Sequence, residues 1–432
     1  MYEIASLAMT RSCFSVEIKT PCYQKEEIMK ALMLTLNPLR FVALQLLRPI
    51  SGKFCYTGPF STIRLTDIPE PRLPSPEWVK IKTRLCGFCG SDLNLLMMKD
   101  SPTAMPFTSF PCVPGHEFCG DVVETGADVT SVKNGDLVTV FPALNCDTRG
   151  IRPVCRSCAA GIPGNCENFA EGAFAPGMFI GICKDINGGF AEYVIAHKSH
   201  ICRVPPGVSA ESAALTEPLA VGLQAVLDNM PGDSDKVLII GGGIIGAMVV
   251  KSIRALGRSC DITVVEPSPF AAGYAKKSGA DRTIGGGIIE AAVDIAGGRA
   301  YKPELGERIV MGGFDRVYDT VGHRDTLNKS LRVLATHGTL SVIGIGKEVK
   351  LDLTPLWLKL QTVKGCYGYR YNTVKDGRKQ AFEMALDIIA EKKVRVDDML
   401  THKFRIEDYR NMIDVNMHKT TNQAIKTAVT FE

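Results

Sequence analysis

The sequence lacks a strong excess of one charge and a long uninterrupted apolar run. Its 50 Lys and Arg residues nearly balance 46 Asp and Glu residues, and no block of like charges stands out. This balance argues against an electrostatic footprint for nucleic acid or an anionic membrane. The most apolar early stretch, Ile28–Leu47, is interrupted by Lys30, Pro38 and Arg40, and a spanning helix needs about 20 predominantly apolar residues. We therefore expect no membrane span and a small molecule as partner.

Cysteine is too scarce for a disulfide scaffold. The 15 cysteines among 432 residues lie far below the roughly 8–10% of such scaffolds, their number is odd, and no credible secretory signal is present. We therefore expect a cytoplasmic protein with reduced thiols. Nine of the fifteen cysteines lie between Cys86 and Cys183, which points to metal chemistry in one region.

The length predicts two or three domains, since a domain usually holds about 100–200 residues. Residues 1–28 have no clear periodicity, so we expect a mobile extension before an opening strand at Met29–Thr35, and Met29 is a candidate for the real start. From Pro59 to about Pro218, short β-branched runs alternate with Gly and Pro. This pattern predicts a mostly β region with strands at Trp78–Arg84, Asp121–Glu124, Asp136–Phe141 and Phe190–Ala196.

After Pro231 the pattern changes to apolar strands that alternate with helical segments. The expected strands are Lys236–Ile240, Asp261–Glu266, Asp315–Asp319 and Thr339–Ile343, and the expected helices are Ile244–Leu256, Phe270–Ser278 and Leu327–Ala335. Apolar strands without polar alternation predict a parallel, doubly wound sheet that helices cover on both faces. The end of the chain predicts a strand at Thr362–Tyr369, a helix around Gln380–Lys392 and a last strand at Ala428–Phe431. The fold class is therefore α/β.

A glycine-rich loop follows the strand Lys236–Ile240 and precedes a helix, which is the context that a GxGxxG motif needs. Gly241 permits a tight turn, Gly243 lets the backbone approach a pyrophosphate, and Gly246 lets helix and strand pack closely. The amides of Ile244 and Ile245 face the anion. Glu266 ends the next strand, 20 residues beyond Gly246, where it is expected to bind a ribose 2′-hydroxyl and to repel a 2′-phosphate. The motif predicts NAD rather than NADP; the alternative is a glycine-rich turn that binds nothing.

Two groups of residues suggest metal sites. Cys155, Cys158 and Cys166, with Cys146 upstream, lie on a Pro- and Gly-rich segment and suit a closed tetrahedral structural zinc site; the alternative is surface thiols in a reducing cell. The second group is dispersed over CGFCGSD at Cys86–Asp92, GHE at Gly115–Glu117, and Glu217. A thiolate, an imidazole and a carboxylate would form an open, catalytic zinc site. Cys86 and Cys89 are alternatively a redox pair, and a single His is often a packed residue.

The joint order of CGFCGSD, GHE, the cysteine segment, EPLAVG at Glu217–Gly222, and GGGIIG with Glu266 resembles the zinc-dependent medium-chain alcohol dehydrogenases over about residues 29–432. The resemblance implies a GroES-like, partly open β-barrel-like catalytic domain from residues 29–219 and 364–432, with a zinc lobe at about 142–170. It also implies a Rossmann NAD-binding domain at 220–363 and a homodimer or homotetramer.

The resemblance also implies roles for individual residues. Cys89 and His116 would bind a catalytic zinc, with Glu217 as the carboxylate ligand and Glu117 as a neighbouring acid that exchanges onto the metal. Ser91 would take the proton of the substrate, and Asp92 would orient His116. Cys86 would then be a buried thiol outside the ligand set. Two zinc ions per chain are expected, one catalytic and one structural.

Three features depart from the family pattern. Many relatives carry a fourth lobe cysteine three residues before Cys155, where this sequence has Arg152, so Cys146 is the substitute ligand. The relay position that is often His is Asn94, which does not titrate, so the proton is expected to leave through the ribose and water. The segment Leu95–Phe110 is unusually apolar and either packs in the core or lines the cleft; lining the cleft would favour a bulky apolar or alicyclic alcohol over a polyol.

These observations predict a zinc- and NAD-dependent enzyme that reversibly oxidises a primary or secondary alcohol to an aldehyde or ketone by hydride transfer. A polyol, sugar or threonine dehydrogenase is the alternative within the same family. A nucleotide-binding relative that has lost catalysis is the alternative from another class.

Overall fold

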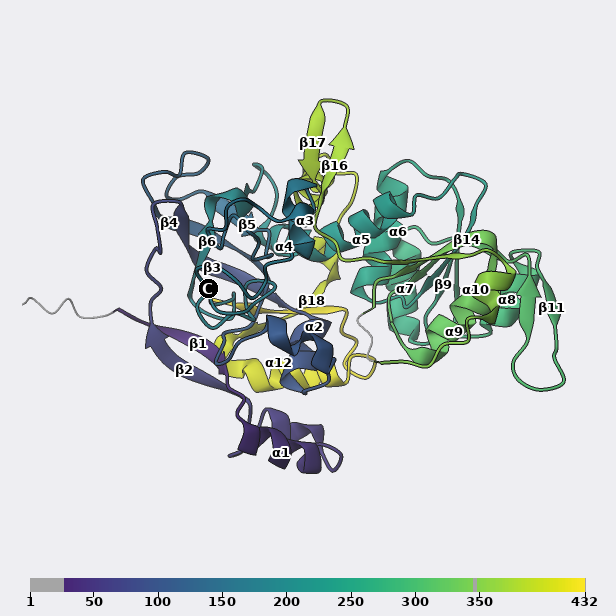
Figure 1. Ribbon diagram of the computed structural model, residues 1–432, viewed down its shortest axis with the longest axis horizontal. Coiled ribbons are helices and arrows are strands. Elements are labelled where there is room, and N and C mark those ends of the chain that lie inside the picture. The colour runs from purple at the N-terminus through teal and green to yellow at the C-terminus, as the bar shows by residue number, and fades with distance from the viewer. Residues whose placement is uncertain (1–26, 345–347, 432) are drawn as a thin grey trace, which may run out of the picture.

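The computed structural model describes residues 27–344 and 348–431, so the predicted extension at 1–28 lies almost wholly outside the described residues. Two β-sheet regions lie side by side in Figure 1. One contains the early strands and the end of the chain, and the other contains the parallel sheet with helices α6 to α10. The long helix α5 (Thr216–Asp228) lies where the two regions meet.

The first region is built on strand β3 (Trp78–Phe88), which is buried along most of its length. A seven-stranded sheet runs in the order β18-β19-β3-β4-β5-β7, and β6 also pairs with β3. The other strands of this sheet are β4 (Glu117–Thr125), β5 (Leu137–Val140), β6 (Tyr193–His197), β7 (Ile201–Arg203), β18 (Leu400–Arg405) and β19 (Lys426–Thr430). Strand β19, near the end of the chain, pairs antiparallel with β3, so segments more than 300 residues apart lie in one sheet.

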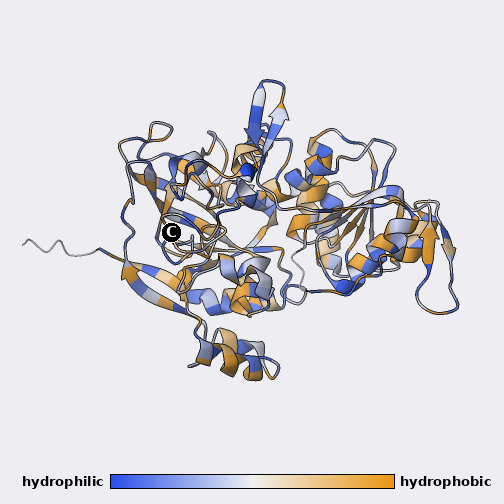
Figure 2. Ribbon diagram, in the orientation of Figure 1, coloured by the Kyte–Doolittle hydropathy of each residue, from blue (hydrophilic) through white to orange (hydrophobic). Residues whose placement is uncertain are grey.

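The second region contains a six-stranded parallel sheet in the order β10-β9-β8-β13-β14-β15. These strands are β8 (Lys236–Ile240), β9 (Asp261–Val265), β10 (Arg282–Ile284), β13 (Phe314–Asp319), β14 (Leu334–Val342) and β15 (Thr362–Gly365). In chain order this arrangement is 3-2-1-4-5-6, which is the doubly wound Rossmann topology. The central strands are almost wholly buried, and Figure 2 shows their hydrophobic residues between the covering helices. The α/β prediction is confirmed.

Helices cover both sheets. The longer ones are α1 (Pro38–Leu47), α6 (Ile244–Ala255), α7 (Pro269–Lys277), α9 (Arg324–Val333), α11 (Ala381–Ala390) and α12 (Tyr409–Met417). The shorter ones are α2 (Gly90–Leu96), α3 (Arg156–Ala159), α4 (Ala210–Ala214), α8 (Ile288–Asp294) and α10 (Thr354–Leu358). Among the described residues, none of these helices has both the length and the apolar character needed to cross a bilayer.

Several features differ from the sequence-based expectation. Strand β15 runs to Gly365 and belongs to the parallel sheet, two residues beyond the expected domain boundary at 363. The strand predicted at Met29–Thr35 is β1 (Ile28–Leu34), but its pairing with β2 (Ile63–Pro69) was not expected. Two further two-stranded sheets were not expected: β11 (Arg299–Tyr301) with β12 (Ile309–Met311), and β16 (Tyr371–Val374) with β17 (Gly377–Gln380). Helix α1 was not expected either, although Asn37 caps it and Pro38 opens it, because its apolar residues do not lie on one face.

Candidate active site and metal centres

The side chains of Cys89, His116 and Glu117 converge in the first region, with one ligand atom of each within 4.8 Å of the others. Cys89 is the N-cap of α2, directly after β3, and Glu117 opens β4. Because β3 and β4 pair antiparallel with Gly87 opposite Glu117, the end of one strand faces the start of the other. Thiolate, imidazole and carboxylate are ligands that suit zinc, so the donor set fits the predicted catalytic metal.

Asp92 lies behind this group and is buried. Its carboxylate accepts a hydrogen bond from the backbone N–H of Cys89 at 2.9 Å and lies 3.6 Å from His116 Nδ1. The ring of Phe179 packs edge-on against His116, with 4.9 Å between centroids. A carboxylate at Nδ1 leaves Nε2 to face a metal, which is the usual arrangement of a metal-bound imidazole.

Glu217, the expected carboxylate ligand, lies outside the three-residue group. It sits in the first turn of α5, where its carboxylate accepts a hydrogen bond from the hydroxyl of Tyr369. Burial, and after it the nearby Glu117, raise the pKa of Glu217 to about 8. Several acidic groups therefore share one buried volume, and a divalent cation would relieve their repulsion. The role of Glu217 as a ligand stays a prediction.

Lys426 is a site residue that the sequence reasoning missed. Its ammonium forms an ion pair with the Glu117 carboxylate, and both side chains are only 1% exposed. Burial disfavours the charged lysine, but Glu117 and Cys89 outweigh burial and raise its pKa. Gly87 is required here because a Cβ atom would lie 2.3 Å from Glu117 Oε2 and 3.0 Å from Lys426 Cε. A lone lysine in the apolar terminal strand β19 was the available signal.

The remaining catalytic candidates lie on or beside α2. Ser91 is half-buried in the first turn of this helix, two residues after Cys89, and Asn94 lies one turn further on. Cys86 is fully buried and lies outside the group of ligand atoms, where burial raises the pKa of its thiol.

The apolar segment Leu95–Phe110 divides between core and surface. Leu96 and Met97 are buried in the core of the first region, and Leu95, Met98 and Phe110 pack against that core. Met105 and Phe107 are exposed. Most of the large apolar side chains in the segment therefore serve core packing, one of the two roles that the sequence left open.

The four lobe cysteines, Cys146, Cys155, Cys158 and Cys166, also converge, with all four sulfur atoms within 4.8 Å of one another. Cys146 Sγ lies 3.6 Å from Cys166 Sγ, and backbone N–H groups of Cys155, Glu167 and Asn168 donate to the sulfur atoms. Such donors stabilise thiolates, and four sulfur donors around one point suit a structural zinc. The structure thus brings together the whole predicted ligand set; Cys146 as a zinc ligand stays a prediction.

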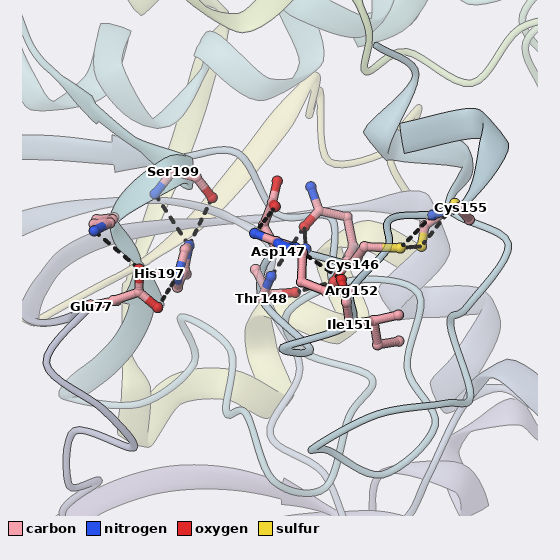
Figure 3. Close-up of polar contacts among 12 residues, drawn as sticks. Glu77, Cys146, Asp147, Thr148, Ile151, Arg152, Cys155, His197 and Ser199 are labelled. Carbon is pink, nitrogen blue, oxygen red and sulfur yellow. Dashed lines mark hydrogen bonds and ion pairs between the residues drawn. The ribbon is translucent and has the colours of Figure 1, made fainter. Parts of the chain in front are cut away.

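Arg152, at the position where many relatives carry a cysteine, is bound elsewhere. Its guanidinium forms an ion pair with Asp147 at 2.8 Å, and the side chain is largely exposed. Figure 3 shows this pair beside Cys146 and Cys155. The cluster therefore contains Cys146 and not Arg152.

Arg149 is a buried residue that connects parts of the zinc lobe through hydrogen bonds. It was not identified from the sequence. The side chain is 1% exposed, and its guanidinium donates to the backbone carbonyls of five residues at 2.7–3.3 Å: Leu144, Glu171, Phe174, Ala175 and Gly177. A single buried cation thus ties the segment that bears Cys146 to the loop 171–177.

The glycine loop in the second region has the geometry of a dinucleotide site. Gly241 has a φ of 94°, and a Cβ on Gly246 would lie 1.9 Å from the Gly241 carbonyl oxygen, so both positions require glycine. A Cβ on Gly243 would meet nothing within 4 Å, which leaves open space in front of the loop. Gly243 is the N-cap of α6 without a side-chain cap, so the amides of Ile244 and Ile245 face that space.

Glu266 follows β9 and faces the same loop. Its carboxylate accepts hydrogen bonds from the backbone N–H groups of Gly242 and Ser268, both at 2.8 Å. These bonds fix the carboxylate at the edge of the loop, where the sequence predicted contact with an adenosine ribose.

Comparisons with known proteins agree with this geometry. Residues 75–206 match the family model described as "Alcohol dehydrogenase GroES-like domain", and residues 245–391 match "Zinc-binding dehydrogenase". The chain is 31% identical to (R,R)-butanediol dehydrogenase of Bacillus subtilis, over 79% of this chain and 92% of the relative. It is 27% identical to sorbitol dehydrogenase 2 of Saccharomyces cerevisiae, over 82% and 91%.

A solved structure of 2R,3R-butanediol dehydrogenase from Bacillus subtilis superposes with a TM-score of 0.69 at 25% identity, covering 94% of this chain and 100% of that chain. Family models, relatives and fold agree with the two predicted metal clusters and the dinucleotide loop. The chain therefore belongs to the zinc-dependent medium-chain dehydrogenase family, and it is an alcohol or polyol dehydrogenase that uses zinc and a nicotinamide dinucleotide.

Proposed function

We propose that this enzyme oxidises a small vicinal diol or polyol at a secondary carbon, with NAD as the hydride acceptor. The observation that carries the proposal is the convergence of Cys89, His116 and Glu117 beside a polar wall. Glu217 and Tyr369 supply that wall, and the rings of Tyr367 and Tyr369 lie 5.5 Å apart. The most similar relatives named above act, by their names, on butanediol and sorbitol.

The packing of Leu95–Phe110 supports the same choice. A bulky apolar substrate needs apolar side chains along the cleft, but Leu96 and Met97 are buried in the core. Met105 and Phe107 are exposed and therefore accessible to an apolar substrate. An apolar alcohol is for this reason the second candidate substrate.

Cys89, His116 and Glu117 would hold the catalytic zinc, with Glu217 close enough to alter the charge of the site. When bound, the metal supplies a Lewis acid that favours the ionised form of a substrate hydroxyl. Asp92 orients the imidazole of His116, and Lys426 fixes the Glu117 carboxylate. Ser91 would accept the hydroxyl proton and release it toward water, since Asn94 does not titrate.

The glycine loop and Glu266 determine whether the enzyme uses NAD or NADP. The amides at the start of α6 would bind the pyrophosphate, and the Glu266 carboxylate would accept a hydrogen bond from the ribose 2′-hydroxyl. A fixed carboxylate repels a 2′-phosphate, which supports NAD over NADP.

The test is a panel of butanediol isomers, polyols, and aliphatic and alicyclic alcohols, with NAD reduction followed by absorbance. We expect the highest kcat/KM for a vicinal diol or polyol; a preference for an alicyclic alcohol would refute the substrate class. Cys89→Ala and His116→Ala should abolish turnover while NAD binding, measured by calorimetry, persists. Activity in either variant without zinc would refute the mechanism.

We also propose a homodimer joined at strand β15, with a tetramer as the larger alternative, in the cytoplasm. All four residues of β15 are exposed at the sheet edge, and β14 is its one partner among the described strands. Exposed apolar side chains of Trp357, Leu360 and Val363 lie on and beside this edge, and such an edge favours pairing with another copy. Trp357→Asp should shift the protein toward monomer in analytical ultracentrifugation; an unchanged mass would refute this interface. The described cysteines are all free, which supports a reducing compartment.

A further inference from the structure

Helix α1 presents an apolar surface to solvent. Leu39, Val42, Leu46 and Ile50, on the helix and the turn that follows it, are 86%, 59%, 72% and 77% exposed. They recur at intervals of three or four residues, so they form one stripe along the helix. Every residue classed as exposed between Pro38 and Ile50 is apolar, since the other two are Pro38 and Pro49. Figure 1 shows α1 at the end of the β1–β2 arm, and Figure 2 shows its hydrophobic colouring.

The charged residues of α1 point toward the protein instead. Arg40 donates to the hydroxyl of Thr35 at 2.6 Å, and Arg48 donates to the carbonyls of Met97 and Met98 at 2.8 and 2.9 Å. Leu44 is fully buried between them. A surface helix usually turns its polar side to water, so α1 is inverted, and its orientation is fixed by contacts that another rotation would break.

The charge of this arm is equally uneven. Residues 28–69, from the start of β1 to the end of β2, contain five basic residues and one acidic residue, Asp67, whereas the rest of the sequence carries equal numbers of basic and acidic residues. Lys30 and Lys53 pair with Glu407 and Asp414 from the chain end. Arg40, Arg48 and Arg64 bond to carbonyl or hydroxyl oxygens, which leaves their positive charges without a carboxylate among the described residues.

We propose that the stripe on α1, formed by Leu39, Val42, Leu46 and Ile50, docks the enzyme on an anionic membrane surface. Aliphatic side chains at the tip of a basic arm fit the boundary between acyl chains and acidic headgroups, into which such helices insert by about 5–10 Å. A second copy fits less well, because a ten-residue helix is about 15 Å long and a stable interface buries about 800 Å² per partner.

This inference modifies the expectation of no membrane contact. That expectation rested on the absence of a dense block of basic residues, but the arm from β1 to β2 holds five basic residues against one acidic residue. The contact places the catalytic domain at the membrane, because Arg48 ties α1 to the residues that directly follow α2, the helix capped by Cys89. It does not depend on the proposed substrate.

The test is sedimentation of the full chain with phosphatidylcholine vesicles that contain or lack phosphatidylserine. We expect binding to the anionic vesicles that weakens with salt. The variant Leu39→Ser, Val42→Ser, Leu46→Ser should lose at least about tenfold in binding, because each buried methylene contributes to insertion. The matched control is Leu305→Ser, since Leu305 is 91% exposed in the β11–β12 region far along the chain. Turnover should persist in both variants, which shows that they fold.

Two results would overturn the proposal: no binding of the active full chain to anionic vesicles, or unchanged binding of the triple variant. A photo-crosslinking residue at Val42 identifies the occupant directly. A lipid adduct supports the proposal, whereas a crosslink to a second copy, to residues 1–26 or to another protein would overturn it.

Discussion

Replacement of Arg149 by Met tests how the zinc lobe is held together. The guanidinium is buried, has no carboxylate partner within the described residues, and donates to five backbone carbonyls. Methionine keeps much of the volume but removes every donor. The carbonyls of Leu144, Glu171, Phe174 and Gly177 then lose this donor, whereas the Ala175 carbonyl still accepts from the Cys183 thiol at 3.3 Å. The loop 171–177 loses its attachment to the segment that bears Cys146.

The magnitude follows from opposing contributions. Each carbonyl left unsatisfied costs about 1–3 kcal/mol, so the four that lose their donor cost roughly 4–12 kcal/mol. The variant no longer buries a charge, which stabilises the folded state by several kcal/mol, and the buried methionine side chain stabilises it by about 2 kcal/mol more. We expect Arg149→Met to lower the free energy of unfolding of the catalytic region by about 3–5 kcal/mol. Arg149→Lys, which keeps the charge with fewer donors, should cost less.

Trp78 provides a local reporter for this experiment. Its ring packs edge-on against Phe174 at 5.4 Å, and the Phe174 carbonyl is one of the five acceptors. The protein has two tryptophans, so a Trp357→Phe background isolates the signal of Trp78. Urea titration followed by fluorescence should show the loss, together with faster release of zinc to a chelator. A change below about 1 kcal/mol, with zinc release unaltered, would refute the role assigned to Arg149.

Three further predictions concern metal, cofactor and pH. Cys146→Ser should reduce zinc from about two to about one per chain by elemental analysis, whereas Cys183→Ser, outside the cluster, should retain both. Glu266→Ala should raise the NADP-to-NAD ratio of kcat/KM by at least about tenfold, and an unchanged ratio would contradict the role of this carboxylate. Burial lowers the pKa of His200 to about 3, so the stability that its neutral ring contributes is present above pH 6.5 and is lost as the pH falls toward 3. When the pH falls from 6.5 to 5, the free energy of unfolding measured by urea titration should therefore decrease by about 2 kcal/mol less in His200→Phe than in the wild type. An equal decrease in both proteins would contradict this linkage.

Local patterns in the sequence predicted much of the fold. Strand β8, which precedes the glycine loop, has the bounds that the sequence predicted. Its residues after Lys236 are all apolar, because a central parallel strand is buried on both faces. The glycine spacing likewise predicted the loop, since Gly241 and Gly246 each meet a backbone or conformational limit that no other residue satisfies. Such features depend on neighbours within a few residues of the chain.

Long-range features escaped the sequence for a physical reason. Helix α1 has apolar residues on every side, so periodicity predicted no buried face. The inward direction of Arg48 depends on the carbonyls of Met97 and Met98, which lie about 50 residues further along the chain. Arg149 is similar, because its acceptors are carbonyls, which every residue carries and which no sequence pattern marks.

The choice between the two candidate carboxylate ligands shows the same limit at the active site. Both Glu117 and Glu217 satisfy the family pattern, and their distance along the chain says nothing about which reaches the metal. In the fold, the pairing of β3 with β4 brings Glu117 close to Cys89. Strand β19 contributes Lys426, which forms an ion pair with Glu117, whereas Glu217 accepts a hydrogen bond from Tyr369. The ion pair with Lys426 holds the Glu117 carboxylate within the ligand group, while burial and the neighbouring Glu117 raise the pKa of Glu217. This arrangement depends on residues of distant segments, which no local pattern in the sequence marks.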